Sequence, residues 1–554
     1  MGDRQVKNLA ERDTRESIHA PDSGWAREKG EDNPAARKED GMGYLKWGWE
    51  NVFSFEHLFL QREYYPTRKD LSRGLWNKFS IFSPQLRTIA GAENMVQCAA
   101  ERAVLKSSKK SVLIKRVNKM AELQPLKGIR YNRALVSDLA EVVTPPFDVI
   151  SPQAQERYYA RHPYNVIRLE LTKPEGKEDA LNNRYTQAAA TYGEWRLNGV
   201  LRQEEQPAFY LYQQRFTYGG KPYIRTSLLA RVRLEPWSAQ VIFPHERTFP
   251  KAKDDRLQLL RATATQFSPL MALYEDPQAR MRRLLAPYAA NPQVQFTDEL
   301  SEQHLLQPIT DRRQISLIQD FFAERPLFIA DGHHRYETAL NYRNEIRERR
   351  KGVAAADAVN YVMMALIDMQ DEGLLVLPTH RLLYGLDAET LTKLTREHLA
   401  QFFTVEELPQ EAGSEELVRH LAEAARRGPS MVIQTPGERF LLTINERGRE
   451  EMARSGHAPA WNELDVAIAH RLLVESLLGL RAQDITAGRY VRYVHEAEEA
   501  LQAVRQGEAQ AALLLNATPV QQISEVAQVG ELMPQKATYF YPKLITGLVM
   551  NPLW

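Results

Sequence analysis

Apolar and polar positions alternate along this chain in patterns that separate strands from helices. Apolar residues at every second position predict a half-buried strand over 165–171, and apolar residues at helical spacing predict a helix over 182–197. Two apolar runs, 207–217 and 222–234, flank the Tyr-Gly-Gly-Lys sequence at 218–221. Because paired glycines allow the backbone of a tight turn, these runs are typical of a β-hairpin.

Similar patterns continue through the second half of the chain. A short apolar run at 327–330 leads into helical spacing, and an Asp-Glu-Gly sequence at 371–373 predicts a second hairpin between 361–369 and 374–378. The other elements that we predict are helices over 253–263 and 463–478, strands over 270–274, 490–494 and 511–516, and a hairpin of 431–434 with 440–444.

Hairpins and strand-helix crossovers occur together, which predicts a mixed α/β (α+β) fold with a mixed sheet rather than a purely parallel one. A chain of 554 residues is also too long for one core. We therefore expect three regions: an N-terminal segment 1–118, a core domain 120–385 and a C-terminal α/β domain 386–554.

The N-terminal segment has a different composition from the rest of the chain. Residues 1–40 are dense in charge and poor in aliphatic side chains, which is typical of disorder, and residues 102–119 are basic. Lys115-Arg116-Val117 can be encoded by a purine-rich stretch resembling a ribosome-binding site, just upstream of Met120. We expect that translation begins at Met120 and that the preceding residues are disordered or a spurious extension.

The composition excludes several classes of protein. A net charge of +1 argues against nucleic-acid binding by bulk electrostatics, and the single cysteine, Cys98, excludes a disulfide framework and a cysteine-based zinc site. No uninterrupted apolar run approaches the ~18 residues of a membrane span, and no signal peptide is visible at the start. We expect a cytoplasmic enzyme or binding protein.

The densest group of chemically active residues follows the apolar run at 327–330. Asp331, Gly332, His333, His334 and Arg335 are consecutive, and the helical pattern begins among them. A helix start has unpaired N–H groups and a positive dipole end, so cationic side chains there predict an anion site, most simply for phosphate. Gly332 would let the backbone approach the ligand. The alternative is an ordinary helix start with Asp331 as its cap.

A second polar group lies between Pro244 and the helix predicted from 253. His245, Glu246 and Arg247 form a loop, and Lys253 and Arg256 lie at the start of the helix. Such a loop can hold a second phosphate or a carboxylate, and Glu246 can accept a proton from a substrate hydroxyl. A solvated charged loop explains the same residues equally well.

Three further segments carry candidate residues. The Thr-Pro-Pro-Phe-Asp sequence at 144–148 is a stiff turn, in which Asp148 or Ser151 is expected to cap the next helix. His380 and Arg381 leave the end of a predicted strand. Segment 533–543 contains Lys536, Lys543 and three aromatic residues, which is typical either of a phosphate-clamping flap or of a strand that covers the core.

The order of these motifs resembles that of one family. From residue 120 to the C-terminus, the chain shows P-P-F-D-V-I-S-P, N-V-I-R-L-E-L, H-E-R-T, A-D-G-H-H-R-Y-E-T-A-L, L-P-T-H-R and M-P-Q-K-A-T-Y-F-Y-P-K. This order is similar to that of the bacterial and archaeal DUF1015 family. The D-G-H-H-R segment also resembles the motif of ParB-like and free-serine-kinase proteins, which implies binding of nucleotide phosphates and phosphorylation of free L-serine from ATP, ADP or pyrophosphate.

The first hypothesis is therefore a phosphotransferase acting on a small hydroxyl substrate. Its catalytic residues would be Asp331, Glu246 and His334, with Asp331 as Mg²⁺ ligand or base, because Mg²⁺ favours few carboxylates together with phosphate oxygens. The expected substrate and phosphate ligands are Gly332, His333, Arg335, His245, Arg247, Lys253, Arg256, His380, Arg381, Lys536 and Lys543.

Two alternatives remain open at this point. A ParB-like module would use the same phosphate site without catalysis, but no second recognition helix follows the motif, so binding of nucleic acid is not expected. A metal-dependent phosphatase would use the same groups in the reverse direction. Neither alternative requires a membrane, and the expected partners are a small-molecule substrate and a phosphoryl donor.

Overall fold

The computed structural model describes residues 121–554, apart from 249 and 351. The predictions for residues 1–118 and for a start at Met120 lie outside the described residues.

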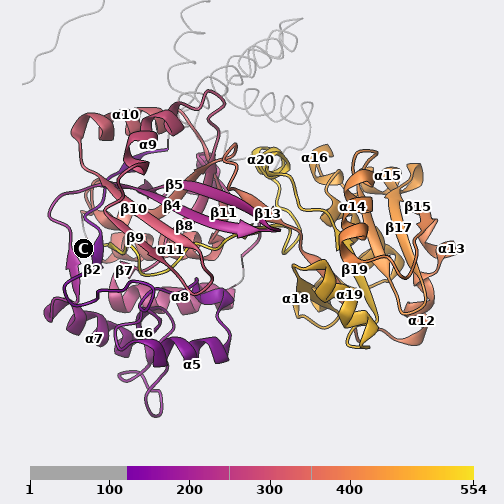
Figure 1. Cartoon of the computed structure of the whole chain (residues 1–554), viewed down its shortest axis with the longest axis horizontal. Coiled ribbons are helices and arrows are strands. Elements are labelled where there is room, and N and C mark those ends of the chain that lie inside the picture. The colour runs from indigo at the N-terminus through magenta and orange to yellow at the C-terminus, as the bar shows by residue number, and fades with distance from the viewer. Residues whose placement is uncertain (1–120, 249, 351) are drawn as a thin grey trace, which may run out of the picture. The chain divides into compact units, whose positions relative to one another are not determined.

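A nine-stranded mixed sheet forms the centre of the first half of the chain (Figure 1). Its strands follow the order β6-β11-β8-β12-β5-β4-β10-β9, and β1 pairs with β5. Parallel pairs (β11 with β6, β12 with β8) lie among antiparallel ones, so the predicted mixed α/β fold is confirmed. The strands are β1 (Leu123–Gln124), β4 (Phe209–Tyr218), β5 (Lys221–Arg233), β6 (Ile242–Phe243), β8 (Leu270–Tyr274), β9 (Val294–Thr297), β10 (Gln303–Ile309), β11 (Leu327–Asp331) and β12 (Tyr361–Asp368).

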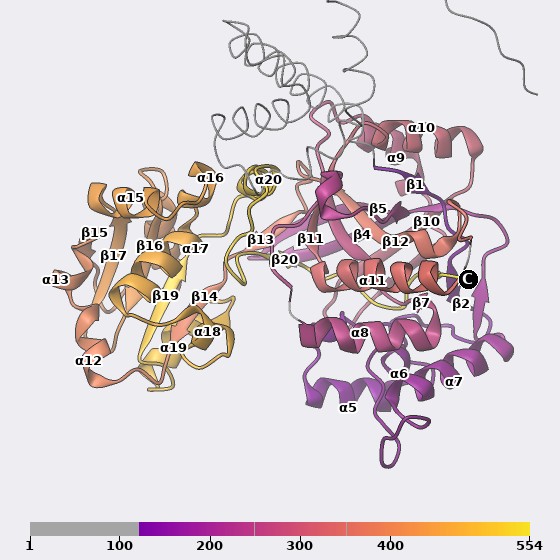
Figure 2. The same ribbon diagram turned by 180° about the vertical axis from the view of Figure 1, so that it is seen from behind.

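Strand β8 shows how this sheet is buried on both faces. All five of its residues are buried: Met271 and Leu273 belong to one apolar cluster, and Leu270, Ala272 and Tyr274 to another. Helix α11 packs against the sheet, and α8 runs alongside α11 (Figure 2). The helices of this part are α5 (Pro152–Arg161), α6 (Ile167–Glu170), α7 (Arg184–Leu197), α8 (Pro250–Thr263), α9 (Arg280–Ala289), α10 (Arg312–Phe322) and α11 (His333–Arg349).

A six-stranded antiparallel sheet forms after residue 379, in the order β15-β17-β16-β19-β14-β18. Its strands are β14 (His380–Leu383), β15 (Phe403–Glu407), β16 (Ser430–Gln434), β17 (Arg439–Ile444), β18 (Val491–Val494) and β19 (Ala511–Leu515). The helices around it are α12 (Ala388–Leu391), α13 (Arg396–Leu399), α14 (Ser414–Ala424), α15 (Glu446–Ala453), α16 (Pro459–Asn462), α17 (Asp465–Ile468), the π-helix η7 (Ala469–Leu477), α18 (Ala482–Thr486), α19 (Ala497–Arg505) and α20 (Val520–Gln528).

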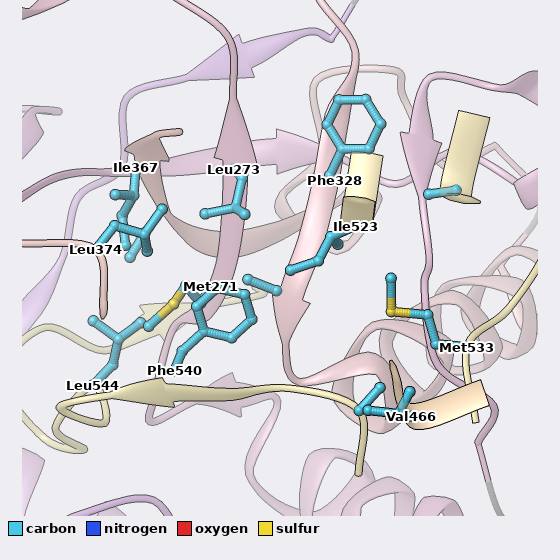
Figure 3. Close-up of a cluster of buried hydrophobic side chains, with 14 of the residues drawn as sticks. Met271, Leu273, Phe328, Ile367, Leu374, Val466, Ile523, Met533, Phe540 and Leu544 are labelled. Carbon is cyan, nitrogen blue, oxygen red and sulfur yellow. The ribbon is translucent and has the colours of Figure 1, made fainter. Parts of the chain in front are cut away.

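The end of the chain returns to the elements of the first half. Strand β20 (Tyr539–Tyr541) pairs with β13 (Leu375–Leu377), and β21 (Asn551–Pro552) pairs with β7 (Thr265–Gln266). The small sheet of β2 (Ile129–Tyr131) and β3 (Leu201–Gln203) is bridged to Met550. Figure 3 shows Phe540 and Leu544 packed near Met271 within one buried cluster. The last residues of the chain are therefore part of the core.

Several predicted elements match the structure closely. The hairpins around 218–221 and 434–439, strand 270–274, the helix over 182–197 and the strand-turn-helix at 327–349 are confirmed. Ser151 caps α5, because its hydroxyl accepts a hydrogen bond from the Ala154 N–H (3.2 Å).

The predicted strand over 165–171 is wrong. The side chain of Asn165 accepts a hydrogen bond from the Ile167 N–H (3.0 Å), and Leu171 N–H donates to Ile167 carbonyl (3.0 Å), so the segment turns into helix α6. Asn165 also donates to the Glu141 carbonyl (2.7 Å). This tertiary contact stabilises the turn over the extended form that the alternation predicts.

The hairpin predicted between 361–369 and 374–378 does not form. Asp371 instead accepts a hydrogen bond from the Thr226 N–H of β5 (3.2 Å), and Gly373 packs against the backbone of Ile224 with no room for a Cβ. Strand β13 therefore leaves the direction of β12 and pairs with β20. Residues 371–373 do form a turn, but the strands on either side of it pair with other strands.

Within the described ranges, 121–554 without 249 and 351, no helix is both long and apolar enough to cross a membrane.

Candidate functional site

The site is built where β11 ends and α11 begins. The register of β11 against β8 shifts between Ile329 and Asp331, and such an irregularity turns the next side chain in a new direction. Gly332 occupies the N-cap position with a φ of 94°, which favours glycine. The alternative interpretation, in which Asp331 caps the helix, is wrong, because Gly332 is the cap and no side chain makes a capping bond there.

Asp331 is the centre of an ion cluster. Its Oδ1 accepts a hydrogen bond from Lys543 Nζ (2.9 Å), and its Oδ2 accepts one from Arg335 Nη2 (3.0 Å). Arg335 is held further by Ser268 Oγ (3.0 Å) and the Pro269 carbonyl (2.9 Å). The three ionic side chains are 13–21% exposed, so they lie close to water without being freely solvated.

The electrostatics of this cluster favour its charged forms. Burial alone would raise the pKa of Asp331, but Lys543 and Arg335 hold that pKa well below its ordinary value. Burial alone would lower the pKa of Lys543, but the bond to Asp331 raises it above the ordinary lysine value. The site therefore holds two fixed cations and one anion near neutral pH.

His245 and His333 support this helix start from inside. His245 Nδ1 donates to the Ile329 carbonyl (2.7 Å), its backbone N–H donates to His333 Nε2 (3.2 Å), and the two rings meet edge to face. Burial lowers the pKa of His245 to about 4 and the pKa of His333 well below its ordinary value. His245 is therefore neutral, and its Nε2 accepts a hydrogen bond from the Thr538 hydroxyl (3.0 Å).

Glu246 lies beside the C-terminal segment. Its carboxylate accepts a hydrogen bond from the Lys536 N–H (3.3 Å). Burial raises its pKa above the ordinary value, against the opposing charge of Lys536. His334 is half-buried, and its pKa is lowered by burial while Glu246 and Glu337 act in the opposite direction. Glu246, His334 and Lys536 thus belong to one electrostatic neighbourhood.

Lys253 lies near the start of α8 and pairs with a carboxylate of α11. Its Nζ pairs with Glu337 (2.6 Å), which also accepts hydrogen bonds from Thr248 Oγ1 (2.7 Å) and Trp237 Nε1 (3.3 Å). The carboxylate of Glu337 therefore fixes the loop that carries His245 against the helix that carries Arg335.

Within the described part of the chain, four of the predicted ligands make no hydrogen bond or ion pair to Asp331, Arg335 or Lys543. Arg247 is exposed. Arg256 is buried in a pair with Glu170 (3.3 Å). His380 accepts the Leu515 N–H (3.1 Å) inside the second sheet, and Arg381 donates to the Lys536 carbonyl (3.3 Å). Arg381 thereby positions the segment that carries Lys536.

Three neighbours of the cluster were missed from the sequence. The charges of Arg335 and Asp148 act on the buried Glu170, and Asp148 also acts on Lys543. The ring of Tyr539 lies 4.5 Å from Lys543 Nζ. Asp148 was visible only as a turn residue, and Glu170 lay in the stretch misassigned as a strand. The feature of the sequence that could have indicated Tyr539 is the close spacing of aromatic residues and lysines at 536–543.

The residues at Asp331 do not fit a resident metal ion, because both carboxylate oxygens already pair with cations. The same arrangement fits a phosphate. A bound phosphate would receive charge-assisted hydrogen bonds from Arg335 and Lys543 beside the positive end of α11. The role of Asp331 as a base stays a prediction, and its predicted role as a metal ligand would require Lys543 or Arg335 to release the carboxylate.

Several solved structures are similar to this chain at low identity. A free serine kinase mutant in complex with ADP has 11% identity over 57% of this chain and 87% of that chain, with a TM-score of 0.30. A conserved hypothetical protein from Pyrococcus furiosus has 12% identity over 59% and 97%, with a TM-score of 0.31. SbnI from Staphylococcus aureus, truncated at its C-terminus, has 13% identity over 59% and 87%, with a TM-score of 0.29.

No curated protein matches the chain significantly. The family described as "Protein of unknown function (DUF1015)" matches residues 123–467, which is more than half of the 554 residues and includes the loop of His245, strand β11 and helix α11. The chain therefore belongs to the DUF1015 family.

Proposed function

We propose that this protein is a phosphotransferase that moves a phosphoryl group from a soluble donor to a small hydroxyl substrate. The observation that carries the proposal is the ion cluster in which Lys543 and Arg335 flank Asp331 at the start of α11. Phosphoryl transfer depends mainly on positioning and on stabilising negative charge. Two cations fixed beside a helix N-terminus meet that need.

The cations and the anion have different parts in this proposal. Arg335 and Lys543 bind the phosphate oxygens, and the N-terminal N–H groups of α11 add their dipoles. Asp331 keeps both cations in place before the donor binds, because it pairs with each of them. His334 provides a neutral imidazole at the same helix end, since burial lowers its pKa.

Glu246 is the general base in this proposal. A useful base has a pKa that approaches neutrality, and burial raises the pKa of Glu246. Asp331 is a weaker base because its two cationic partners lower its pKa. Lys536, whose N–H binds the Glu246 carboxylate, lies where it can receive the substrate's own negative group.

The proposed donors are ATP, ADP and pyrophosphate, and the proposed acceptor is L-serine. These choices come from the resemblance of the D-G-H-H-R segment to free serine kinases, one of which has been solved with ADP. Mg²⁺ enters with the donor, as a phosphate complex, and no catalytic step is assigned to a metal ligand on Asp331.

The test is ³¹P NMR of the full chain with L-serine, Mg²⁺ and each donor in turn. We expect phosphoserine to form with at least one donor. Lys543→Met and Arg335→Lys should each lower the rate about 100-fold, since each removes a fixed contact to transferring phosphate. Arg313→Gln, on the exposed face of α10, is the matched loss of one cation and should keep the wild-type rate.

Two results would contradict the proposal. Phosphate binding without product from any donor would indicate a binding module. Equal rates in Lys543→Met, Arg335→Lys and wild type would place the chemistry elsewhere in the molecule.

A further inference from the structure

A second group of titratable residues lies in the connection between β9 and β10. Asp298 and Glu302 belong to this turn, and His304 is the second residue of β10. One potential ligand atom from each of the three lies within 4.8 Å of the others. Asp298 Oδ2 is 3.1 Å from His304 Nε2. Ligand atoms that bind one cation lie about 2.0–2.2 Å from it. Small movements of these side chains would bring the three ligand atoms to such distances from a shared ion.

The imidazole of His304 is rigidly held. It is fully buried and stacks against Tyr212 and Phe296. Its Nδ1 is hydrogen-bonded to the Tyr212 hydroxyl (2.8 Å), which directs Nε2 toward Asp298. Metal-binding histidines commonly have their second ring nitrogen held in this way.

Each of the two carboxylates has one oxygen that makes no hydrogen bond to the backbone and is available to a shared ion. Asp298 Oδ1 accepts hydrogen bonds from the Leu300 and Glu302 N–H groups (both 2.9 Å), so Oδ2 is left for His304. Glu302 is only 4% exposed, yet its Oε1 is buried with no hydrogen-bond partner among the described residues. A buried carboxylate oxygen without a partner is costly, and a cation would satisfy it.

Arg225 does not fill that role. Its charge acts on Glu302, but its guanidinium forms no ion pair within 4 Å among the described residues and donates instead to Gln214. Two carboxylates and one imidazole therefore lie close together, and no lysine or arginine of the described part of the chain pairs with either carboxylate. Imidazole with carboxylate is a ligand set for first-row transition metals, whereas Mg²⁺ and Ca²⁺ prefer oxygen ligands alone.

We propose that Asp298, Glu302 and His304 bind one divalent transition-metal ion, Zn²⁺ or Mn²⁺. Three protein ligands leave at least one coordination position for water. This site is separate from the ion cluster at Asp331 and does not depend on the proposed phosphotransferase activity. It does adjoin the same C-terminal segment, because Tyr541 of β20 bonds to the Glu302 side chain.

The experiment is isothermal titration calorimetry of the full chain, stripped with EDTA, against ZnCl₂, MnCl₂ and MgCl₂ separately. We expect one equivalent of Zn²⁺ or Mn²⁺ to bind, with Mg²⁺ much weaker. X-ray absorption of the bound metal should show one nitrogen and several oxygen ligands. Asp298→Asn and Glu302→Gln should each weaken binding at least about 100-fold, because each removes a ligand charge.

The controls separate loss of the site from loss of the fold. Asp320→Asn removes an exposed carboxylate of α10 and should bind metal like wild type. Circular dichroism identifies any variant that unfolds. If Glu302→Gln unfolds, Asp298→Asn decides the test alone, because Asp298 is less buried than Glu302. No Zn²⁺ or Mn²⁺ binding by wild type, or unchanged affinity in folded Asp298→Asn, overturns the proposal.

Discussion

At the scale of single residues, the pair between Asp331 and Lys543 is the most consequential contact of the site. We expect Lys543→Met to destabilise the protein by about 3 kcal/mol, since removing one partner of a buried ion pair costs about 3–5 kcal/mol and Arg335 still pairs with the carboxylate. Urea unfolding followed by circular dichroism measures this change.

A double variant distinguishes the cause of that loss. Asp331→Asn combined with Lys543→Met removes both partners of the contact, and Arg335 also loses its ionic partner. We expect the double variant to lose less stability than the sum of the losses in the two single variants, while phosphotransferase activity stays low. If the two substitutions destabilise additively, the pair does not contribute as the 2.9 Å contact indicates.

The residues of the site differ in how far sequence could identify them. Asp331 and Arg335 are only four positions apart, so the local geometry of the helix start brings them close enough to pair. Lys543 is 212 positions from Asp331, and no local pattern relates the two. Glu170 comes within electrostatic range of Arg335 where a tertiary bond of Asn165 turns its segment into a helix. The sequence therefore predicted Asp331, Arg335 and Lys543 as site residues but not the bonds that join them.

At the scale of elements, the start of α11 depends on Gly332. A Cβ at this glycine would lie 3.0 Å from Arg335 Nη2 and from Leu270 Cγ, and the backbone has a φ of 94°. We expect Gly332→Ala to cost about 1–2 kcal/mol from the left-handed backbone. It should also displace Arg335 and reduce activity, as measured by ³¹P NMR.

Gly352, just beyond the same helix, provides the matched control. It has a φ of 95°, but no atom lies within 4 Å of its potential Cβ. Gly352→Ala should therefore lose a similar amount of stability and keep full activity. Comparable loss of activity in both variants would mean that helix stability, rather than the position of Arg335, limits the reaction.

Elements were predicted well where the local pattern and the tertiary contacts agree. The β4–β5 hairpin has two glycines with positive φ in its turn and forms as expected. Strand β13 is different. The turn before it forms as predicted, but its partner strand is β20, which lies more than 150 positions later in the chain. Pairing between distant strands depends on the whole chain and leaves little trace in local alternation.

At the scale of the whole molecule, buried neutral histidines make stability depend on pH. Burial lowers the pKa of His380 to about 4, and its Nδ1 accepts a bond from the Leu515 N–H. The unfolded chain binds this proton below about pH 6.5, whereas the folded chain does not until about pH 4. This group therefore destabilises the fold by up to about 3 kcal/mol as pH falls from 6.5 to 4.

Other groups act in the opposite direction, so a variant is needed to isolate His380. Burial raises the pKa of Asp371 and Asp465 to about 6, which favours the folded state as the pH falls. His380→Asn keeps an acceptor for Leu515 but cannot take up a proton. We expect this variant to be less stable than wild type at pH 7. The difference between their free energies of unfolding, measured in urea, should become about 3 kcal/mol smaller at pH 4.

The last prediction concerns the return of the C-terminus to the first sheet. Removing residues 533–554 would delete Lys543 and β20 and expose the partners of three buried side chains, Phe540, Val549 and Met550. Each such side chain contributes about 1.5–3 kcal/mol, so their joint loss approaches a typical total stability of about 5–15 kcal/mol. The truncated chain should lack a cooperative thermal transition. Deleting Trp554 alone, which is 57% exposed, should leave that transition nearly unchanged. A normal transition in the longer truncation would mean that 121–532 folds independently of its C-terminal segment.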